Sequence, residues 1–279
     1  LVGMKKLIEI HGISWLRPLL TISRSDLRKF LKFNKLNWVE DPSNEDRKYL
    51  RVKSRNIISQ LRKLGINTDL VVNTSIRMKN AKKVLDDVAV EAFNNFITLK
   101  KWGDIEVNKD IFSYCREDTI LRTLAGIIKG ISGSVYRPRY RELINFAEGL
   151  NNKNFKARTL SGVLARAISK NKIVLRREPS HPICISNLKS KNFIWDGRWL
   201  VSLAKPLSKS EYIGPLGNNG YQQIKNQVED KKTNECFLST PTLFLEDKVI
   251  SSPAFEYGNG ISCKLQHNKK QFINCFITH

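Results

Sequence analysis

The hydrophobic pattern along the chain is clearest between residues 75 and 96. Apolar side chains recur there at intervals of three and four, which places them on one face of an α-helix. The apolar positions are Ala81, Val84, Leu85, Val88, Ala89, Ala92, Phe93 and Phe96. Shorter patterns of the same kind predict helices over residues 121–130 and 140–150. We interpret this middle region as a helical bundle.

Residues 1–73 carry the signals of further helices. Ser23-Arg24-Ser25-Asp26 is typical of a capping box, in which the first serine accepts a hydrogen bond from a backbone N–H of the first turn. Asn34 can end the helix that follows. Asp41-Pro42-Ser43-Asn44 is typical of a turn, and a second helix is expected from about Asp46.

After Arg158 the pattern changes to short β-rich runs separated by turn residues. We predict hairpins at Lys170-Asn171, Asp196-Gly197, Glu246-Asp247 and Asn268-Lys269. Residues 214–235, rich in Gly, Asn and charge, are predicted to be irregular. The fold class predicted for the whole chain is therefore α+β.

Charge adds a first indication of function. The 279 residues contain 48 Lys and Arg against 26 Asp and Glu, a net charge of +22. Such an excess favours a polyanionic partner, with nucleic acid as the leading candidate, although a generally basic proteome is the alternative. No apolar run is long enough to span a membrane. The five cysteines form no C-x-x-C pair, so reduced thiols in a cytoplasm are expected, without a zinc site or disulfide framework.

The chain contains no self-contained catalytic motif. It has no Gly-Gly pair, and therefore no S-G-G-x-D-S nucleotide loop, and it has no G-x-x-x-x-G-K-[ST] loop. Its four histidines lie far apart without the spacing of metal ligands. We therefore assign no catalytic residue and no metal ligand.

The strongest candidate for chemistry is a basic stretch after the Asp41 turn. Five of the nine residues from 47 to 55 are basic. On a helix, Lys48, Arg51 and Arg55 fall within about 60° of one another, and Arg62 extends the row. Such a row suits phosphate oxygens, whereas the alternative is a solvated helix face.

The same stretch belongs to a longer ordered pattern that resembles the tRNA(Ile)-lysidine synthetases, a bacterial family. The matching segments are Arg17-Pro18-Leu19-Leu20, the run from Trp38 through Asp41-Pro42-Ser43-Asn44 to Asp46, and Tyr49 with Arg51 and Arg55. The family carries R-P-L-L and then W-x-x-D-P-S-N-x-D-x-x-Y-x-R-N-x-x-R. Val52 replaces the Asn of that pattern.

The resemblance continues more weakly toward the C-terminus. The segments similar to family motifs are Ala157–Gly162, Arg176-Arg177-Glu178, Trp195-Asp196-Gly197-Arg198 and Thr240–Pro253. The similarity therefore covers nearly the whole chain, strongly before residue 56 and diffusely after it.

The resemblance implies an ATP-dependent ligase that modifies tRNA. Members attach lysine to C2 of the wobble cytidine of a minor isoleucine tRNA. ATP, with Mg²⁺, first activates that carbon by adenylation, and the lysine amine then displaces AMP from it. The adenylating S-G-G-x-D-S loop lies at the family's N-terminus. We therefore expect this chain to be the C-terminal part of such an enzyme, inactive alone, with a separate N-terminal half as a possible partner.

The resemblance also implies three domains. Residues 1–73 would be the tail of an α/β nucleotide-binding domain, 74–157 a helical tRNA-binding domain, and 158–279 a β-rich C-terminal region. The expected ATP- or tRNA-phosphate contacts are Arg51, Arg55 and Lys48. Asp41, Asn44 and Asp46 are expected to set the turn and cap the helix, and the expected tRNA contacts are Arg137, Arg139, Arg158 and Arg166.

Two hypotheses of different class remain open at this stage. The chain is part of a lysidine-forming ligase, or it is a noncatalytic basic RNA-binding protein derived from one. An S-G-G-x-D-S loop encoded in frame upstream would favour the ligase. A third reading, in which the chain has no nucleic-acid role, would leave the D-P-S-N block without explanation.

Overall fold

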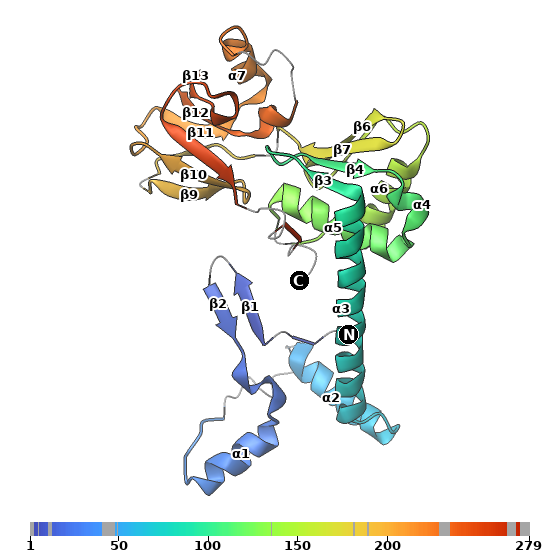
Figure 1. Ribbon diagram of the computed structural model, residues 1–279. Helices are drawn as coiled ribbons and strands as arrows, with labels where there is room; N and C mark the ends of the chain where they lie inside the picture. The colour runs from blue at the N-terminus through green and yellow to red at the C-terminus, as the bar shows by residue number, and fades with distance from the viewer. Residues whose placement is uncertain are drawn as a thin grey trace. The chain divides into compact units, whose positions relative to one another are not determined.

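The computed structural model describes residues 3–4, 6–10, 13–40, 48, 50–134, 136–180, 182–188, 190–228, 235–266 and 272–273. The chain divides into two compact units, residues 1–84 and 85–279, and the division falls within one long helix, α3. Figure 1 shows the elements of each unit, coloured along the chain.

The first unit contains a hairpin and helices. Its elements are β1 (Leu7–Ile10), β2 (Ile13–Leu16), the 3₁₀ helix η1 (Pro18–Thr21), α1 (Arg24–Phe33), α2 (Leu50–Lys63) and the first part of α3 (Thr68–Phe96). β1 and β2 pair antiparallel, with Leu7 opposite Leu16. The expectation of an entirely helical segment is therefore wrong for residues 7–16, where alternating apolar residues form strands instead.

The predicted cap of α1 is confirmed. The side chain of Ser23 accepts a hydrogen bond of 3.1 Å from the backbone N–H of Asp26. At the other end, Asn34 is the C-cap residue of the helix, and its side-chain amide donates to the carbonyl of Phe30 at 2.8 Å. Local polar residues therefore fix both ends of this helix.

Burial is almost absent among the described residues of the first unit. Val52, at 6% exposure, is the one large apolar side chain there that is fully buried. Phe33, Leu50 and Leu64 are 86%, 79% and 76% exposed. The unit therefore exposes the apolar faces that its own sequence pattern creates.

The second unit begins with a five-stranded antiparallel sheet of order β3-β4-β7-β6-β5. Its strands are β3 (Ile97–Leu99), β4 (Ile105–Asn108), β5 (Ala157–Leu160), β6 (Val163–Ser169) and β7 (Lys172–Arg177). Three helices lie between β4 and β5 in the sequence: α4 (Ile111–Tyr114), α5 (Glu117–Ser132) and α6 (Tyr140–Asn151).

Helices and sheet share one core. Phe93 of α3, Leu124 of α5 and Phe146 of α6 belong to the same buried cluster as Ile105 and Leu175 of the sheet. The helices predicted over 75–96, 121–130 and 140–150 are confirmed. Their arrangement as a bundle is wrong, because the apolar stripes of α5 and α6 pack against a sheet whose first strands interrupt the helical region (Figure 1).

The rest of the second unit contains two smaller antiparallel sheets, of order β14-β10-β9 and β13-β12-β11-β8. Their elements are β8 (Ile185–Ser186), β9 (Asn192–Trp195), β10 (Trp199–Leu203), β11 (Glu211–Pro215), α7 (Gly217–Ile224), η3 (Glu235–Ser239), β12 (Pro241–Leu245), β13 (Lys248–Ser251), η4 (Pro253–Phe255) and β14 (Ile261–Leu265). Trp195 and Trp199 from one sheet and Ile213 and Leu243 from the other share a core. The α+β fold class is confirmed.

The predicted turns have mixed outcomes. Hairpins at Lys170-Asn171, Asp196-Gly197 and Glu246-Asp247 are confirmed, and Asn268-Lys269 lies outside the described residues. The prediction of irregular structure over 214–235 is wrong where α7 forms. Tyr221 and Ile224 of that helix are buried with Phe244 and Val249, so tertiary packing stabilises a segment whose Gly and Asn content disfavours a helix.

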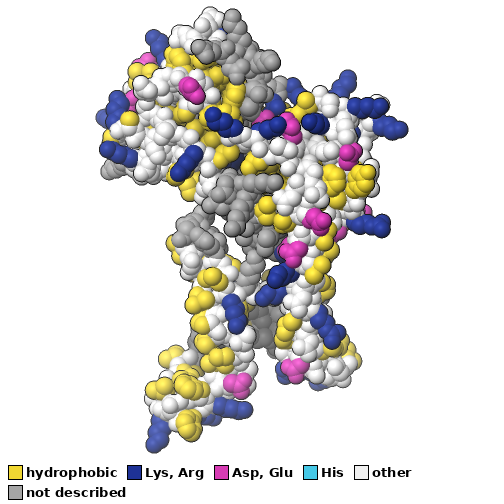
Figure 2. Space-filling model, in the orientation of Figure 1, with side chains coloured by type: hydrophobic (Ala, Val, Ile, Leu, Met, Phe, Trp, Pro, Cys, Tyr) yellow, Lys and Arg dark blue, Asp and Glu magenta, His cyan; other side chains and the backbone are white. Residues whose placement is uncertain are grey.

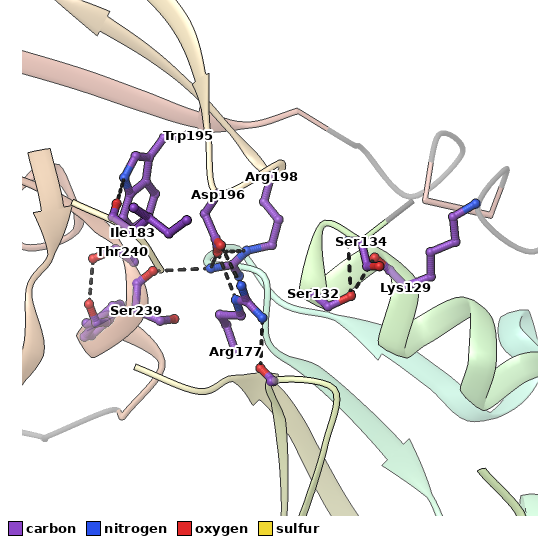
Figure 3. A network of polar contacts seen from close by, with 12 residues as sticks. Lys129, Ser132, Ser134, Arg177, Ile183, Trp195, Asp196, Arg198, Ser239 and Thr240 are labelled. Carbon is purple, nitrogen blue, oxygen red and sulfur yellow. Dashed lines mark hydrogen bonds and ion pairs between the residues drawn. The ribbon is translucent and has the colours of Figure 1, made fainter. Parts of the chain in front are cut away.

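A buried ion network joins the five-stranded sheet to the C-terminal sheets. The carboxylate of Asp196 accepts hydrogen bonds from Nη2 and Nε of Arg177 at 2.7 and 3.0 Å, and from Nε of Arg198 at 2.9 Å. Figure 3 shows Asp196 between the two guanidinium groups. All three side chains are at most 7% exposed. Burial lowers the pKa of Arg198 to about 10, while the Asp196 carboxylate opposes that shift.

The backbone completes the same joint. Gly197 and Gly133, the residue that ends α5, both have positive φ angles, of 64° and 66°. A Cβ atom on Gly133 would lie 2.4 Å from the carbonyl oxygen of Asp196, and one on Gly197 would lie 2.9 Å from that of Gly133. The β9–β10 turn therefore contacts the end of α5 through backbone atoms alone. This close contact leaves no space for a side chain, so both positions require glycine.

We predict that D196N strongly destabilises the second unit. The substitution leaves two buried guanidinium groups without their carboxylate, and such losses lower the free energy of unfolding by about 3–5 kcal/mol. Urea denaturation followed by circular dichroism measures the change. D118N is the matched control, because Asp118 is 58% exposed and pairs with Arg122 at 2.5 Å. The control should cost about 0.5 kcal/mol or less, and an equally small effect of D196N would contradict the role given to the network.

We also predict a pH dependence from Cys263 of β14. Burial raises the pKa of this thiol to about 12, above its ordinary value near 9. Above pH 9 the unfolded chain releases this proton while the folded chain retains it, so the free energy of unfolding falls as pH rises toward 12. Urea titrations of wild type and C263A should show a shallower decline for the variant. C184A, which changes an exposed thiol, should decline like wild type.

Candidate RNA-binding surface

The segment just before Asp41-Pro42-Ser43-Asn44 is attached to α1 by polar contacts. The indole N–H of Trp38 donates to the Glu40 carboxylate at 2.8 Å, and Arg24 pairs with the same carboxylate at 2.5 Å. Arg28 donates to it as well. These groups lower the pKa of Glu40, with the Trp38 hydrogen bond as the largest cause. The chain between α1 and the turn is therefore fixed by polar contacts on an exposed surface.

The residues expected to contact ATP or tRNA phosphate follow this point. Lys48 is exposed, and Arg51 and Arg55 lie within α2, although their side chains are outside the described part of the chain. Asp41, Asn44 and Asp46 also lie outside the described residues. Arg62, at the end of the same row, donates to the Thr68 hydroxyl at 2.6 Å. The roles of all these residues stay predictions.

Arg137 is directed into the second unit. Its guanidinium lies near Asp86 of α3 and near Arg122 and Asp118 of α5, and burial is the largest cause of its lowered pKa. Asp86 is itself only 3% exposed and accepts from Arg122 at 3.2 Å. Arg137 thus attaches the segment before α6 to α3 and α5, and its predicted phosphate contact has no direct support from this geometry.

The other three predicted tRNA contacts are exposed. Arg139 is 88% exposed and lies 3.9 Å from Glu142. Arg158 of the edge strand β5 donates to the carbonyl of Asn145 in α6 at 2.8 Å, and Arg166 lies on β6 opposite Ala157. Paired residues share a face of a sheet, so Arg158, opposite the buried Ala165, lies on the helix side while Arg166 lies on the other side.

These arginines belong to a larger basic edge, which we define as residues 136–172: the segment before α6, then α6, β5, β6 and the turn into β7. Residues 136–172 contain nine Lys or Arg and two Glu, a far stronger excess than in the whole chain. The exposed cations that sequence reasoning did not single out are Arg141, Lys153, Lys156, Lys170 and Lys172. In Figure 2 dark-blue side chains gather around the end of the second unit that carries β6 and α6. Local charge density along the sequence could have identified this edge.

Exposed cations of this kind suit phosphate groups. Each Lys or Arg that neutralises a phosphate releases a counterion, which makes binding strong at low salt and sequence-independent. Contacts of this type position a nucleic acid, whereas base contacts specify it. The basic edge can therefore bind an RNA backbone, and other groups must supply sequence preference.

A depression of about 460 Å³ lies on the face of the five-stranded sheet that also carries Arg166, and it is lined by Trp102, Ile168, Val174 and several charged residues. Two of its three cations are paired within the protein, Lys100 with Glu106 at 3.0 Å and Arg176 with Asp104 at 3.1 Å, whereas Lys101 lies 5.3 Å from the centre of the Trp102 ring. Internal pairing makes this depression a poorer phosphate site than the basic edge.

Among the described residues, no cluster of three His, Cys, Asp or Glu side chains has the geometry to bind a metal ion. In the same part of the chain, no helix combines the length and apolar character needed to cross a membrane.

The amino-acid sequence is similar to proteins that carry the same enzyme name in several bacteria. The family profile of the PP-loop domain matches residues 1–61. The tRNA(Ile)-lysidine synthase of Wolbachia pipientis wMel is 31% identical over 96% of this chain and 64% of its own length. The enzyme of the same name from the Wolbachia of Brugia malayi is 31% identical over 87% of the chain and 57% of its own length. That of Ruegeria pomeroyi is 26% identical over 96% and 62%.

The chain thus spans about three fifths of the length of these curated relatives, and its PP-loop match is confined to the first unit. The resemblance first indicated by the R-P-L-L and D-P-S-N segments is confirmed along nearly the whole sequence. The chain is therefore similar to the tRNA(Ile)-lysidine synthases over nearly its whole length.

Proposed function

We propose that this chain is the tRNA-binding portion of a tRNA(Ile)-lysidine synthase and that it does not catalyse adenylation alone. The complete reaction joins lysine to C2 of the wobble cytidine of tRNA(Ile), at the expense of ATP. The observation that carries the proposal is the combination of similarity to such an enzyme over 96% of the chain with the absence of an S-G-G-x-D-S loop from its 279 residues.

In this proposal the second unit binds tRNA through the basic edge. The helical residues 74–157 and the β-rich residues 158–279 act together, because α6 and β5 are joined by the Arg158 to Asn145 hydrogen bond. The exposed positions of Arg139, Arg158 and Arg166 support their assignment as phosphate contacts.

Residues 1–73 would form the remnant of the adenylating domain, with Arg51, Arg55 and Lys48 as contacts to ATP or tRNA phosphate. Two observations support this assignment: the PP-loop match over residues 1–61 and the exposed apolar faces of the first unit. Such exposed faces indicate an interaction surface. We propose that they pack against the remainder of a PP-loop domain, supplied within a longer chain or by a separate polypeptide.

We predict that the purified 279-residue chain does not incorporate labelled lysine into minor tRNA(Ile) in the presence of ATP and Mg²⁺. The loop that cradles the ATP phosphates is absent from its sequence, and the proposed contacts Arg51, Arg55 and Lys48 cannot position ATP for adenylation without it. Activity should appear when the part of the Wolbachia pipientis relative that this chain does not match is fused upstream or added in trans. Incorporation by the unsupplemented chain would refute the division of labour proposed.

We predict that the isolated chain still distinguishes minor tRNA(Ile) from elongator tRNA(Met), and that binding weakens with salt. Filter binding across a salt series measures both properties. R158Q/R166Q should weaken binding to both tRNAs and reduce the slope of log K against log salt by about 1–2, because about 0.7–0.9 of a counterion is released per phosphate. K264Q, which changes an exposed cation on β14, is the control. Equal binding of the two tRNAs by wild type would instead support a nonspecific RNA-binding protein.

A further inference from the structure

The segment Tyr136-Arg137-Pro138-Arg139-Tyr140-Arg141 presents two aromatic rings at the basic edge. Tyr136 is 81% exposed and Tyr140 is 68% exposed, and Arg139 and Arg141 are exposed beside them. Single exposed aromatic residues are normal on protein surfaces. Two exposed tyrosines within five residues, interleaved with arginines, form a more specific combination.

The segment is fixed in place from beneath. Arg137 is directed toward Asp86 and Asp118, and Pro138 is half-buried. The backbone N–H of Tyr136 donates to the Ser134 hydroxyl at 3.1 Å, and Tyr140 begins the first turn of α6, a helix whose Leu143, Phe146 and Leu150 are buried in the core. Tyr140 is therefore carried by a helix that is anchored in the core, and a rigid display reduces the entropy lost when a ligand orders its ring.

Charge at the segment favours an anion over a cation or a neutral surface. Glu142 lies 3.9 Å from Arg139 and is half exposed, and it is the one carboxylate paired with either arginine in the part of the chain that the structure describes. A contact of that length between exposed groups is weak and screened by salt. A phosphate can therefore compete for these guanidinium groups.

Exposed aromatic rings among cations have one well-defined use on RNA. The faces of unpaired bases stack on tyrosine rings while neighbouring Lys and Arg hold the phosphates. Bases within an A-form duplex are already stacked on one another, so duplex RNA offers no face to these rings. The tyrosine–arginine combination therefore selects unpaired nucleotides over helical stems.

We propose that Tyr136 and Tyr140 form a stacking platform for unpaired nucleotides of the bound RNA, with Arg139 and Arg141 holding the adjacent phosphates. The proposal deepens the function proposed above, on which it rests for the identity of the RNA. It divides the basic edge into two parts. β5, β6 and the β6–β7 turn contact backbone of any sequence, and the segment before α6 recognises a region where base pairing is interrupted.

The test uses the full chain and a short single-stranded oligoribonucleotide that carries 2-aminopurine, whose fluorescence is quenched by stacking. We expect wild type to quench the probe and Y136A/Y140A to bind it at least about tenfold more weakly, as stacking losses on single strands indicate. Y136F/Y140F should retain affinity within about twofold, because the ring remains. The slope of log K against log salt should be unchanged in both variants, since no phosphate contact is lost.

A leucine pair and a second tyrosine serve as controls. Y136L/Y140L keeps apolar area without a π face and should behave like the alanine pair. Y114A removes a tyrosine that is 80% exposed but whose ring stacks on Phe96 at 6.1 Å, and it should bind like wild type. Thermal unfolding of each variant checks the fold.

Unchanged probe binding by the alanine and leucine pairs, or equal quenching of the same strand in a duplex, would overturn the platform. The first outcome would indicate that the tyrosines contact a protein rather than RNA. Failure of the proposed function has a different signature, because it shows as equal binding of tRNA(Ile) and tRNA(Met) by wild type while the single-stranded probe is still quenched.

Discussion

One carboxylate determines how the parts of the second unit fit together. Asp196 accepts hydrogen bonds from Arg177, the last residue of β7, and from Arg198 across the β9–β10 turn. Arg198 in turn donates to the carbonyl of Ser239, and Arg177 donates to that of Gly162. Ion pairs of this kind often contribute less stability than apolar packing would, but removal of one member leaves an uncompensated buried charge. The network therefore specifies one arrangement of the sheets and tolerates few others.

The same network explains why the motif residues near the C-terminus are poor candidates for RNA contacts. Arg177 and Arg198 are buried and paired, whereas the cations of the basic edge are exposed. The chain thus uses arginine in two ways: inside, as a donor of fixed hydrogen bonds to a carboxylate, and outside, as a mobile positive charge. Gly133 connects the two uses, since the backbone that contacts Asp196 leads within three residues to the Tyr136 segment.

Much of this fold is predictable because it depends on local signals. Ser23 and Asn34 end α1, Asp196-Gly197 allows a tight turn, and the apolar periodicity marks α3, α5 and α6. The predictions that were wrong concern features that depend on contacts between residues far apart in the sequence. The packing of α5 and α6 on a sheet requires strands from either side of them in the sequence, and α7 forms because Tyr221 and Ile224 meet Phe244 and Val249. For the candidate site, exposure of Arg158 and Arg166 was predictable from charge, but the inward direction of Arg137 required Asp86 and Asp118, which no sequence pattern joins to it.

Val52 illustrates how a departure from the family pattern can be read physically. The family carries Asn at this position, whereas here Val52 is the one fully buried large apolar side chain among the described residues of the first unit. Burial of a polar amide requires hydrogen-bond partners, while valine requires only apolar contact. Valine in place of asparagine therefore removes the need for hydrogen-bond partners and adds apolar contact in the first turn of α2. The apolar faces around it, with Leu50 and Leu64 largely exposed, gain their stabilisation only when another surface covers them. Under the proposed function, a nucleotide site that uses Arg51 and Arg55 would be coupled to that burial, because α2 carries both residues.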